Sequence, residues 1–497
     1  MTTLTSWLAI FLVLGYSTAV LPSPATPPLS VLLLPLADYS HVLFFVDIGN
    51  ELDRKGHKVH LASTNQYETL LANYPFTFHD IGVADWAPLS YQNASDVISF
   101  FAWILLEKNV AQRKLMWSFV KTIPKDKFDI IIVDNDVLAN FPDNWRNSNA
   151  TLVVVNTYPS YREDPSYSHI SRGTFQVTYM ESLFDSTMHM VKALWTVLLL
   201  YGRDNQAVLF EALRSDLDQG QELHIMHTIP GFHHPIDFPQ LQKYVIVGVP
   251  LSDKKLTHQG TKSVQIWLNQ LRRNDVVVCM SFGSIGYHTK LEEIVKGVLV
   301  TSNATKIILS HRYPERLANT FKSEIRSKRL AVFNWIDQRK VLAHPKTKLL
   351  VTHGGIHSIV EALSQSLPLL MIPYFDSFQE QVLNCLLVQT RGVGEMIKSG
   401  NVNQKRVKEK TKKLLANWEK YSVKAKALYK TNLLAGGAKR AADEIERAWL
   451  QKRYNFKTEK APDTPVLVRL LGIATAIFFP KIVLKICRKC RCKRKTD

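Results

Sequence analysis

Residues 349–361 read LLVTHGGIHSIVE. The first four form a short apolar run of the kind that is buried as a strand in a parallel sheet. His353, Gly354 and Gly355 follow, and residues 356–365 then have helical spacing. This order places backbone N–H groups at a helix N-terminus, where the helix dipole favours an anion. The stretch therefore predicts an α/β domain whose turn binds an anion, and a phosphate fits that turn better than a metal ion.

Further apolar strands lie on both sides of this stretch. The second half of the chain has them at residues 275–282, 306–309, 330–333 and 368–372, with helical segments between. In the first half, a strand at 31–36, a helix at 41–55 and a strand at 58–62 form one Rossmann-like unit, and strands at 128–133 and 152–155 follow. We expect two α/β domains, at residues 28–245 and 246–450, with a strand at 244–250 opening the second block and a polar linker near 252–263.

Composition excludes several classes of protein. The 497 residues suit two to four domains, and 46% hydrophobic with 21% charged residues is typical of a folded chain. Only 5 cysteines and 21 glycines exclude a small disulfide scaffold and collagen. The net charge is +19, but residues 481–497 hold eight Lys and Arg against one Asp. This concentration favours a membrane surface, so we expect no nucleic-acid partner.

The two ends of the chain predict a secretory route. Residues 1–19 contain the apolar run 7–15 and small residues suited to signal-peptidase cleavage, which indicates a signal peptide. Glycosylation sequons begin at Asn93, Asn149 and Asn303.

Residues 466–486 are long enough to span a bilayer, although charges and a proline interrupt them, so an interfacial helix stays open as the alternative. The basic tail, residues 487–497, is expected in the cytosol. Its Lys493 and Lys495 resemble a dilysine retrieval signal. We therefore expect a single-pass type I protein of the endoplasmic reticulum membrane with its folded part in the lumen.

The cysteines fit this picture. Three lie in the basic tail beside the apolar segment, where palmitate could be attached. Cys279 and Cys385 lie in apolar runs and are expected to be buried thiols.

The second block carries the residues suited to a nucleotide. Gly283 and Ser284 follow one strand and offer N–H groups and a hydroxyl without bulk. Ser358 adds a hydroxyl to the first helical turn after Gly355, and Glu361 could accept hydrogen bonds from ribose. Upstream, Trp335 has a flat face for a nucleobase and Gln338 has an amide for its edge.

The order and spacing of these residues resemble the donor-binding signature of UDP-glycosyltransferases. The match runs from Trp335 and Gln338 through His353, Gly355, Ser358 and Glu361 to the proline pairs Leu367-Pro368 and Ile372-Pro373. It extends to residues 281–284 and, near the start of the chain, to residues 40–57. The resemblance covers most of residues 30–450 and is faint across 140–240.

The resemblance implies a GT-B fold, in which two Rossmann-like domains face a central cleft and the second holds the nucleotide sugar. It implies that Trp335 stacks on uracil and that Gln338 and Glu361 hold the uridine. The residues implied for the diphosphate are His353, Gly355, Ser358 and Ser284, with Gly283 beside them. The UDP-sugar would be a co-substrate, with no further cofactor and no metal.

The resemblance also implies an inverting reaction in which His41 is the general base. A histidine suits this role because its ordinary pKa is near neutral. Asp134, at the end of a neighbouring strand, would hold the other ring nitrogen and stabilise the protonated form.

The chain departs from the family pattern at several donor-site positions. Asp337 stands where the family usually has Pro, and His357 where it usually has Asn. Ser377 and Phe378 replace an acidic residue and a Gln that grip the sugar hydroxyls. The flanking Asp376 and Gln379 are the expected substitutes, and the identity of the donor sugar stays open.

Two other interpretations remain. Asp134-Asn135-Asp136 is a DxD triplet, which binds manganese in a different glycosyltransferase fold. A chain with a degenerate sugar site would be a non-catalytic UDP-sugar or lipid-binding protein. For the enzyme, the apolar segment at residues 194–200 and the membrane segment indicate a small lipophilic acceptor. Self-association into a homo-oligomer is also open.

Overall fold

The computed structural model describes residues 27–83, 109–124, 126–138, 149–156, 223–232, 244–251, 261–283, 288–311, 313–374 and 379–454. Several expectations fall outside these ranges: the signal peptide, the segments 194–200 and 466–486, the basic tail, Asn93, Ser284, Asp376, Ser377 and Phe378. Within the described ranges, no helix is both long and apolar enough to cross a bilayer.

The N-terminal domain is built on a parallel sheet of seven strands in the order β3-β2-β1-β4-β5-β6-β7. The inner strands are almost fully buried, as expected for a sheet covered on both faces. The strands are β1 (Ser30–Leu34), β2 (Lys58–Ser63), β3 (Thr77–Asp80), β4 (Ile130–Asp134), β5 (Thr151–Asn156), β6 (Leu223–Met226) and β7 (Tyr244–Ile246).

A long helix of this domain begins just after β1 and buries one apolar face on the sheet. This helix, α2, ends where Gly56 adopts a left-handed conformation at φ 89°. The helical segments are α2 (Tyr39–Arg54), η1 (Asn65–Tyr67), α3 (Glu68–Leu71), α5 (Asn109–Thr122) and α6 (Asn135–Leu138).

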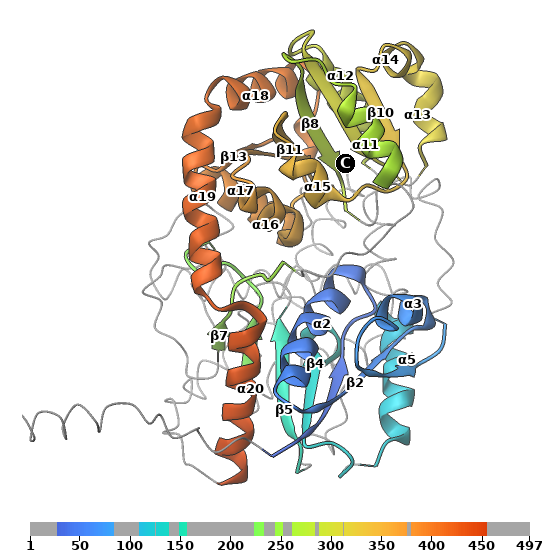
Figure 1. Ribbon diagram of the computed structural model, residues 1–497, viewed down its shortest axis with the longest axis vertical. Helices are drawn as coiled ribbons and strands as arrows, with labels where there is room; N and C mark the ends of the chain where they lie inside the picture. Colours follow the sequence, from blue (N-terminus) through green and yellow to red (C-terminus); the bar gives the residue numbers. More distant parts are fainter. Residues whose placement is uncertain are drawn as a thin grey trace, which may run out of the picture.

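The C-terminal domain repeats the same plan with a six-stranded parallel sheet in the order β10-β9-β8-β11-β12-β13. Its strands are β8 (Val276–Ser281), β9 (Thr305–Ser310), β10 (Leu330–Phe333), β11 (Thr347–Thr352), β12 (Leu369–Met371) and β13 (Gly394–Met396). Figure 1 shows the two domains one above the other, joined along one side by a pair of long helices.

The helices of the C-terminal domain cover its sheet and extend beyond it. They are α11 (Thr261–Asn269), α12 (Leu291–Leu299), α13 (Glu315–Thr320), α14 (Lys322–Arg326), α15 (Gln338–Ala343), α16 (Ile356–Ser364), α17 (Gln379–Thr390), η4 (Ser399–Asn401), α18 (Gln404–Ala416) and α19 (Trp418–Leu434).

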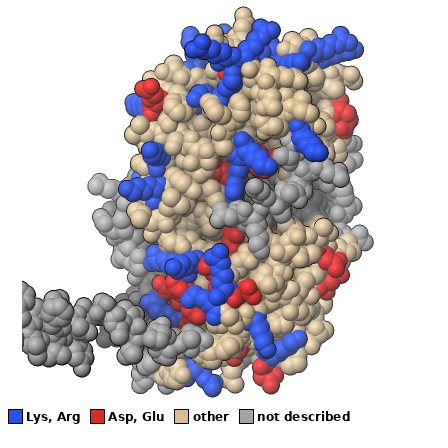
Figure 2. Space-filling model, in the orientation of Figure 1, with Lys and Arg blue, Asp and Glu red and all other residues tan. Residues whose placement is uncertain are grey.

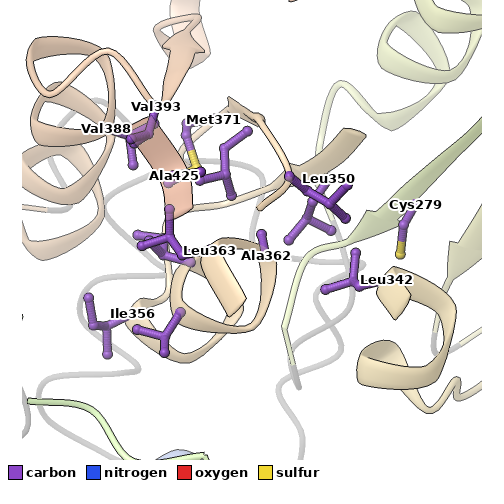
Figure 3. Packing of buried hydrophobic residues seen from close by; sticks show 14 of the residues in the cluster. Cys279, Leu342, Leu350, Ile356, Ala362, Leu363, Met371, Val388, Val393 and Ala425 are labelled. Atoms are coloured by element: carbon purple, nitrogen blue, oxygen red, sulfur yellow. The ribbon is translucent and has the colours of Figure 1, made fainter. Parts of the chain in front are cut away.

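A mixed layer of aliphatic and sulfur side chains forms the core between this sheet and its helices. Figure 3 shows Cys279, Leu350 and Met371 of three strands packed against residues of α15, α16 and α17. Cys279 and Cys385 are both buried and free, as predicted. Burial raises the pKa of the Cys279 thiol, so this side chain behaves as a small apolar group.

The last described helix, α20 (Gly437–Arg453), returns to the N-terminal domain. It packs against α2, β5 and β6, and its alanines join the core of that domain. Figure 1 shows α19 and α20 following one another down the side of the molecule. Lys55 reinforces this contact with ion pairs to Asp443 at 2.7 Å and to Glu446 at 2.5 Å.

The domain limits therefore differ from the expected ones at two places. The strand at residues 244–250, expected to open the second block, contains β7, which pairs with β6 as the edge strand of the first sheet. Residues 437–450, expected in the second domain, belong by contact to the first. Local sequence gives the type of an element, whereas its sheet is decided by pairing between distant segments.

Charged side chains are distributed over both domains on the face drawn in Figure 2, with acidic residues among the basic ones around the lower domain. The ion pairs of α20 belong to this mixture, including Arg440 and Arg447 with Glu444.

Candidate functional site

In each sheet the strand order reverses near the centre, at a topological switch point. The candidate residues follow strands near these two points. In the N-terminal sheet the switch lies between β1 and β4, and in the C-terminal sheet between β8 and β11. Ligands of open α/β sheets bind beyond the carboxyl ends of strands at such switch points. Each domain therefore offers one site, set by topology.

His41 and Asp134 meet at the N-terminal switch point. His41 lies in the first turn of α2, after β1, and Asp134 is the last residue of β4. The Nδ1 atom of His41 lies 2.7 Å from Oδ2 of Asp134. The aspartate side chain is fully buried, whereas 15% of the histidine side chain is exposed.

This contact fixes the tautomer of His41. A carboxylate can only accept a hydrogen bond, so the proton of the neutral ring must be on Nδ1. The other ring nitrogen, Nε2, is then the unprotonated one and is the nitrogen that can accept a proton. The backbone N–H of Leu36 also donates to Oδ2 of Asp134, at 3.4 Å. The pair is thus arranged for a base whose protonated form is stabilised by a buried carboxylate.

Gln338, Ser358 and Glu361 gather at the C-terminal switch point. Nε2 of Gln338, the first residue of α15, donates to Oε2 of Glu361 at 2.6 Å and to Oγ of Ser358 at 3.3 Å. Burial raises the pKa of Glu361 to about 7, although the hydrogen bond from Gln338 acts in the opposite direction. A carboxyl group with this pKa changes charge near neutral pH.

Asp337 caps the N-terminus of α15, a role that the family pattern did not predict. It is the N-cap of α15, and its Oδ1 accepts a hydrogen bond from the backbone N–H of Lys340 at 3.2 Å. An aspartate at this position satisfies one of the free N–H groups of the first turn. Asp337, which stands where the family usually has Pro, therefore stabilises the start of the helix that begins with Gln338.

Trp335 lies beside the N-terminal domain. Its ring meets the ring of Tyr39, at the start of α2, edge to face with centroids 5.9 Å apart. Burial raises the pKa of the Tyr39 hydroxyl, and Glu361 and Asp337 contribute electrostatically. Tyr39 thus places the helix that carries His41 next to the predicted nucleoside residues.

His353 is wedged between two glycines. A Cβ atom at Gly283 would lie 2.8 Å from Cε1 of His353, and one at Gly355 would lie 2.9 Å from its Nε2. Gly283 also has a φ of 72°, which side chains rarely adopt. Burial lowers the pKa of His353 to about 4, with a further effect from His288. The ring is therefore neutral at physiological pH and can donate a hydrogen bond without adding charge.

The turn before α16 is held from behind by α17. Nδ2 of Asn384 donates to the carbonyl of Gly354 at 2.8 Å. Gly354 has a φ of 113°, and a Cβ there would lie 2.9 Å from the carbonyl oxygen of Gln381. The backbone at Gly354 is thus held by residues of α17, and Gly354 itself needs no side chain for this. Gln379 begins α17, but its side chain lies outside the described residues.

His357, in the first turn of α16, joins the two domains. Its ring centroid is 5.0 Å from that of His227, which follows β6. Burial lowers the pKa of His357 to about 4, and His41 contributes to this shift. Helix α16 and the N-terminal domain therefore approach each other at this point.

The structure brings together most of the predicted residues, and it adds two. His41 and Asp134 form one group; Gln338, Ser358 and Glu361 form another; Trp335 contacts Tyr39, and His353 lies between Gly283 and Gly355. Tyr39 and His227 were not predicted, because their contacts cross between domains. Tyr39 is two residues from His41, which is the one local signal that pointed to it.

The comparisons with known proteins agree with this geometry. Residues 176–432, more than half of the chain, match the family model of UDP-glucoronosyl and UDP-glucosyl transferases. A solved UDP-glucosyltransferase from Polygonum tinctorium, capable of glucosylating indoxyl, superposes with a TM-score of 0.59 at 18% identity, covering 86% of this chain and 99% of that one. Such neighbours share the GT-B fold, and at this identity the likeness concerns the fold alone.

Two relatives are similar in sequence. A UDP-glucuronosyltransferase of Pleuronectes platessa is 38% identical over 90 residues, 18% of either chain. The human 2-hydroxyacylsphingosine 1-beta-galactosyltransferase is 23% identical over 417 residues, 78% of this chain and 73% of that protein. The match to the first relative thus spans less than a fifth of its length. Together with the family model, the two parallel sheets and the residues at their switch points, these findings place the chain in the UDP-glucuronosyl and UDP-glucosyl transferase family.

Proposed function

We propose that this protein transfers a hexosyl group from a UDP-sugar to a hydroxyl of a small lipophilic acceptor, with inversion and without a metal ion. The observation that supports the proposal most is the 2.7 Å contact between His41 and the buried Asp134. His41 belongs to α2, and Tyr39 of the same helix touches Trp335 of the other domain.

On the acceptor side, Nε2 of His41 takes the proton as the hydroxyl oxygen attacks the anomeric carbon of the sugar. The bond from that carbon to the diphosphate oxygen breaks as the new bond forms, which inverts the configuration. Asp134 accepts the hydrogen bond of Nδ1 throughout and stabilises the imidazolium that results.

On the donor side, the N-terminus of α16 and the neutral rings of His353 and His357 would face the diphosphate. N–H groups and a helix dipole stabilise the charge that develops on the leaving UDP. Gln338 and Glu361 would hold the uridine, and Trp335 would stack on the base. In this proposal Gly283, Ser284, Gly355 and Ser358 complete the diphosphate turn, and Asp376 and Gln379 bind the sugar hydroxyls.

The DxD interpretation is less well supported. Its first residue, Asp134, is fully buried and bonded to His41 and to the backbone of Leu36. A manganese ligand would have to give up these bonds. Transfer that persists in EDTA would agree with the metal-independent reaction, and loss of transfer reversed by Mn²⁺ would contradict it.

The acceptor and the compartment are further parts of the proposal. The human relative is named for transfer to an acylated sphingosine, which supports a lipophilic alcohol. Exposed Asn149 in the N-terminal domain and Asn303 in the C-terminal domain support passage of both domains through the lumen of the endoplasmic reticulum, with residues 466–486 as the membrane anchor.

The test uses full-length protein in membranes, a panel of UDP-sugars and a panel of apolar alcohols, with products identified by mass spectrometry. Once a donor and acceptor are found, His41→Ala should lower kcat by about 10²–10⁴, the usual contribution of a general base. UDP binding should persist, because the nucleotide residues lie in the other domain.

Two results would count against the proposal. Unchanged transfer by His41→Ala would refute the assigned base. UDP binding without turnover of any donor, including hydrolysis, would favour the non-catalytic UDP-sugar-binding protein instead.

A further inference from the structure

His227 is a buried histidine outside the predicted machinery. It follows β6 directly, at the carboxyl end of the N-terminal sheet, and its backbone N–H donates to the carbonyl of Asn156 at 3.0 Å. Only 1% of the residue is exposed. Both of its ring nitrogens lack a hydrogen-bond partner within the described part of the chain. A buried polar group in this state is unusual and calls for an explanation.

The ring of His227 lies between the two helices that meet at the reaction centre. On one side it stacks on Phe44 of α2, with centroids 3.7 Å apart and planes inclined by 17°. On the other side is the ring of His357 in α16, with centroids 5.0 Å apart and planes inclined by 50°. The row Phe44–His227–His357 thus connects the helix that carries His41 with the helix that begins at the diphosphate turn.

The two histidines are complementary as hydrogen-bonding groups. Burial lowers the pKa of His227 well below its ordinary value, and the pKa of His357 is about 4. Both rings are therefore neutral near pH 7, and each has one N–H donor and one acceptor nitrogen. At this centroid separation, a modest rotation of either ring would bring a donor of one to the acceptor of the other. Such a bond would decide which nitrogen of His357 carries its proton.

We propose that His227 is a positioning residue for the bound nucleoside diphosphate. It donates its ring N–H to the unprotonated nitrogen of His357, so that the N–H of His357 faces a phosphate oxygen. The inference rests on the proposed function, because it takes the turn before α16 as the diphosphate site. It gives the unpaired ring of His227 a partner in the donor-bound state.

The test compares two variants that separate packing from hydrogen bonding. His227→Phe keeps a ring that can stack on Phe44 but cannot donate, whereas His227→Gln keeps an N–H donor. UDP binding to the full-length protein is measured by calorimetry. We expect His227→Phe to weaken UDP binding about tenfold, because the N–H of His357 would no longer be held toward the charged phosphate, and His227→Gln to stay within about threefold of the wild type. The control is His60→Phe, which removes an imidazole that is paired with His79 at 2.9 Å in the same sheet and should bind UDP normally.

A spectroscopic readout separates positioning from folding. With histidine labelled by ¹⁵N, the His357 ring should adopt a single tautomer when the wild type is saturated with UDP. In His227→Phe it should show a mixture. If His227→Phe fails to fold, the wild-type spectra decide, because a His357 ring that does not respond to UDP overturns the inference.

The outcomes also distinguish this inference from the proposed function. Wild-type protein that binds no UDP would overturn the proposed donor site itself. Wild-type protein that binds UDP, with His227→Phe binding equally well, would overturn only the role of His227.

Discussion

At the residue scale, burial acts on two kinds of ionisable group with opposite consequences. It keeps His353 and His357 neutral, with pKa values of about 4. It raises the pKa of Glu361 to about 7. Of these three buried groups, Glu361 is therefore the one whose charge changes over the range from pH 6 to 8.

Binding of the nucleotide should depend on the charge of Glu361. Its ionised form is the better acceptor for ribose hydroxyls, and the ionised fraction rises from about a tenth at pH 6 to about nine tenths at pH 8 for a pKa near 7. We expect the affinity for UDP-glucose, whose diphosphate does not titrate in this range, to rise up to about tenfold. Glu361→Gln should abolish this dependence. Calorimetry at pH 6, 7 and 8 checks both, and an equally steep profile in the Gln variant would exclude Glu361 as the cause.

Residues within one domain were predictable from sequence, and residues that act across domains were not. The contact of His41 with Asp134 follows from two strands that end side by side, which is a property of a parallel sheet. The group of Gln338, Ser358 and Glu361 follows from one helix turn and its neighbour. Tyr39 and His227 acquire their neighbours only when the two domains meet, and no spacing in the sequence encodes that meeting.

At the scale of single elements, the short helix α15 depends on its first residues. A helix of this length has little intrinsic stability, because nucleation is costly. The side chain of Asp337 caps it, and Val341 and Leu342 bury it against the sheet. The position of Gln338 therefore depends on a local capping bond as well as on packing.

Removal of this cap should be measurable. Asp337→Ala should lower the free energy of unfolding by about 1 kcal/mol, the usual value of an N-cap. Asp337→Asn, which retains a capping oxygen, should lose only a small part of that. Thermal denaturation of the two variants gives the comparison, and equal stability of Ala and Asn variants would show that the bond to Lys340 contributes nothing.

The positions of helices and strands were also predicted better than the sheet or domain to which each one belongs. Strands β1, β2, β4, β5 and β8 to β12 and the helix after β1 lie where the apolar runs predict them, whereas the short strands β3, β6 and β13 were not predicted. The edge strand β7 and helix α20 were assigned to the other domain. The sequence of a three-residue strand does not indicate which sheet it joins. The alanines of α20 form an apolar face that could pack on either domain.

At the scale of the whole molecule, two segments in the described part of the chain cross between the domains, and they are bonded to each other. Oδ1 of Asn432, near the end of α19, accepts from the backbone N–H of Val249 at 2.8 Å, and its Nδ2 donates to the carbonyl of Val249 at 2.9 Å. The N–H of Gly437 donates to the carbonyl of Val247 at 2.7 Å. Gly248 allows this approach, because a Cβ there would lie 2.7 Å from the carbonyl oxygen of Asn432.

Loss of this double hydrogen bond should weaken the junction. Asn432→Ala leaves the N–H and the carbonyl of Val249 buried without their partners, so we expect a loss of about 2 kcal/mol in the free energy of unfolding. The neighbouring Thr431→Ala is the control, because Thr431 makes only an exposed bond to the carbonyl of Ala427 and should change stability by less than about 0.5 kcal/mol. Denaturant unfolding of both variants decides, and a similar small effect in each would mean that the crossings are held by packing alone.

The return of α20 to the first domain has a practical consequence for building hybrids of related transferases. A chimera that joins the acceptor half of one protein to the donor half of another at a single point after residue 250 would pair one parent's sheet with the other parent's closing helix. Two junctions are required, so that residues 437–453 travel with residues 27–250. Hybrids made this way should retain Lys55 with its matched acidic residues, and therefore the helix that covers α2, β5 and β6.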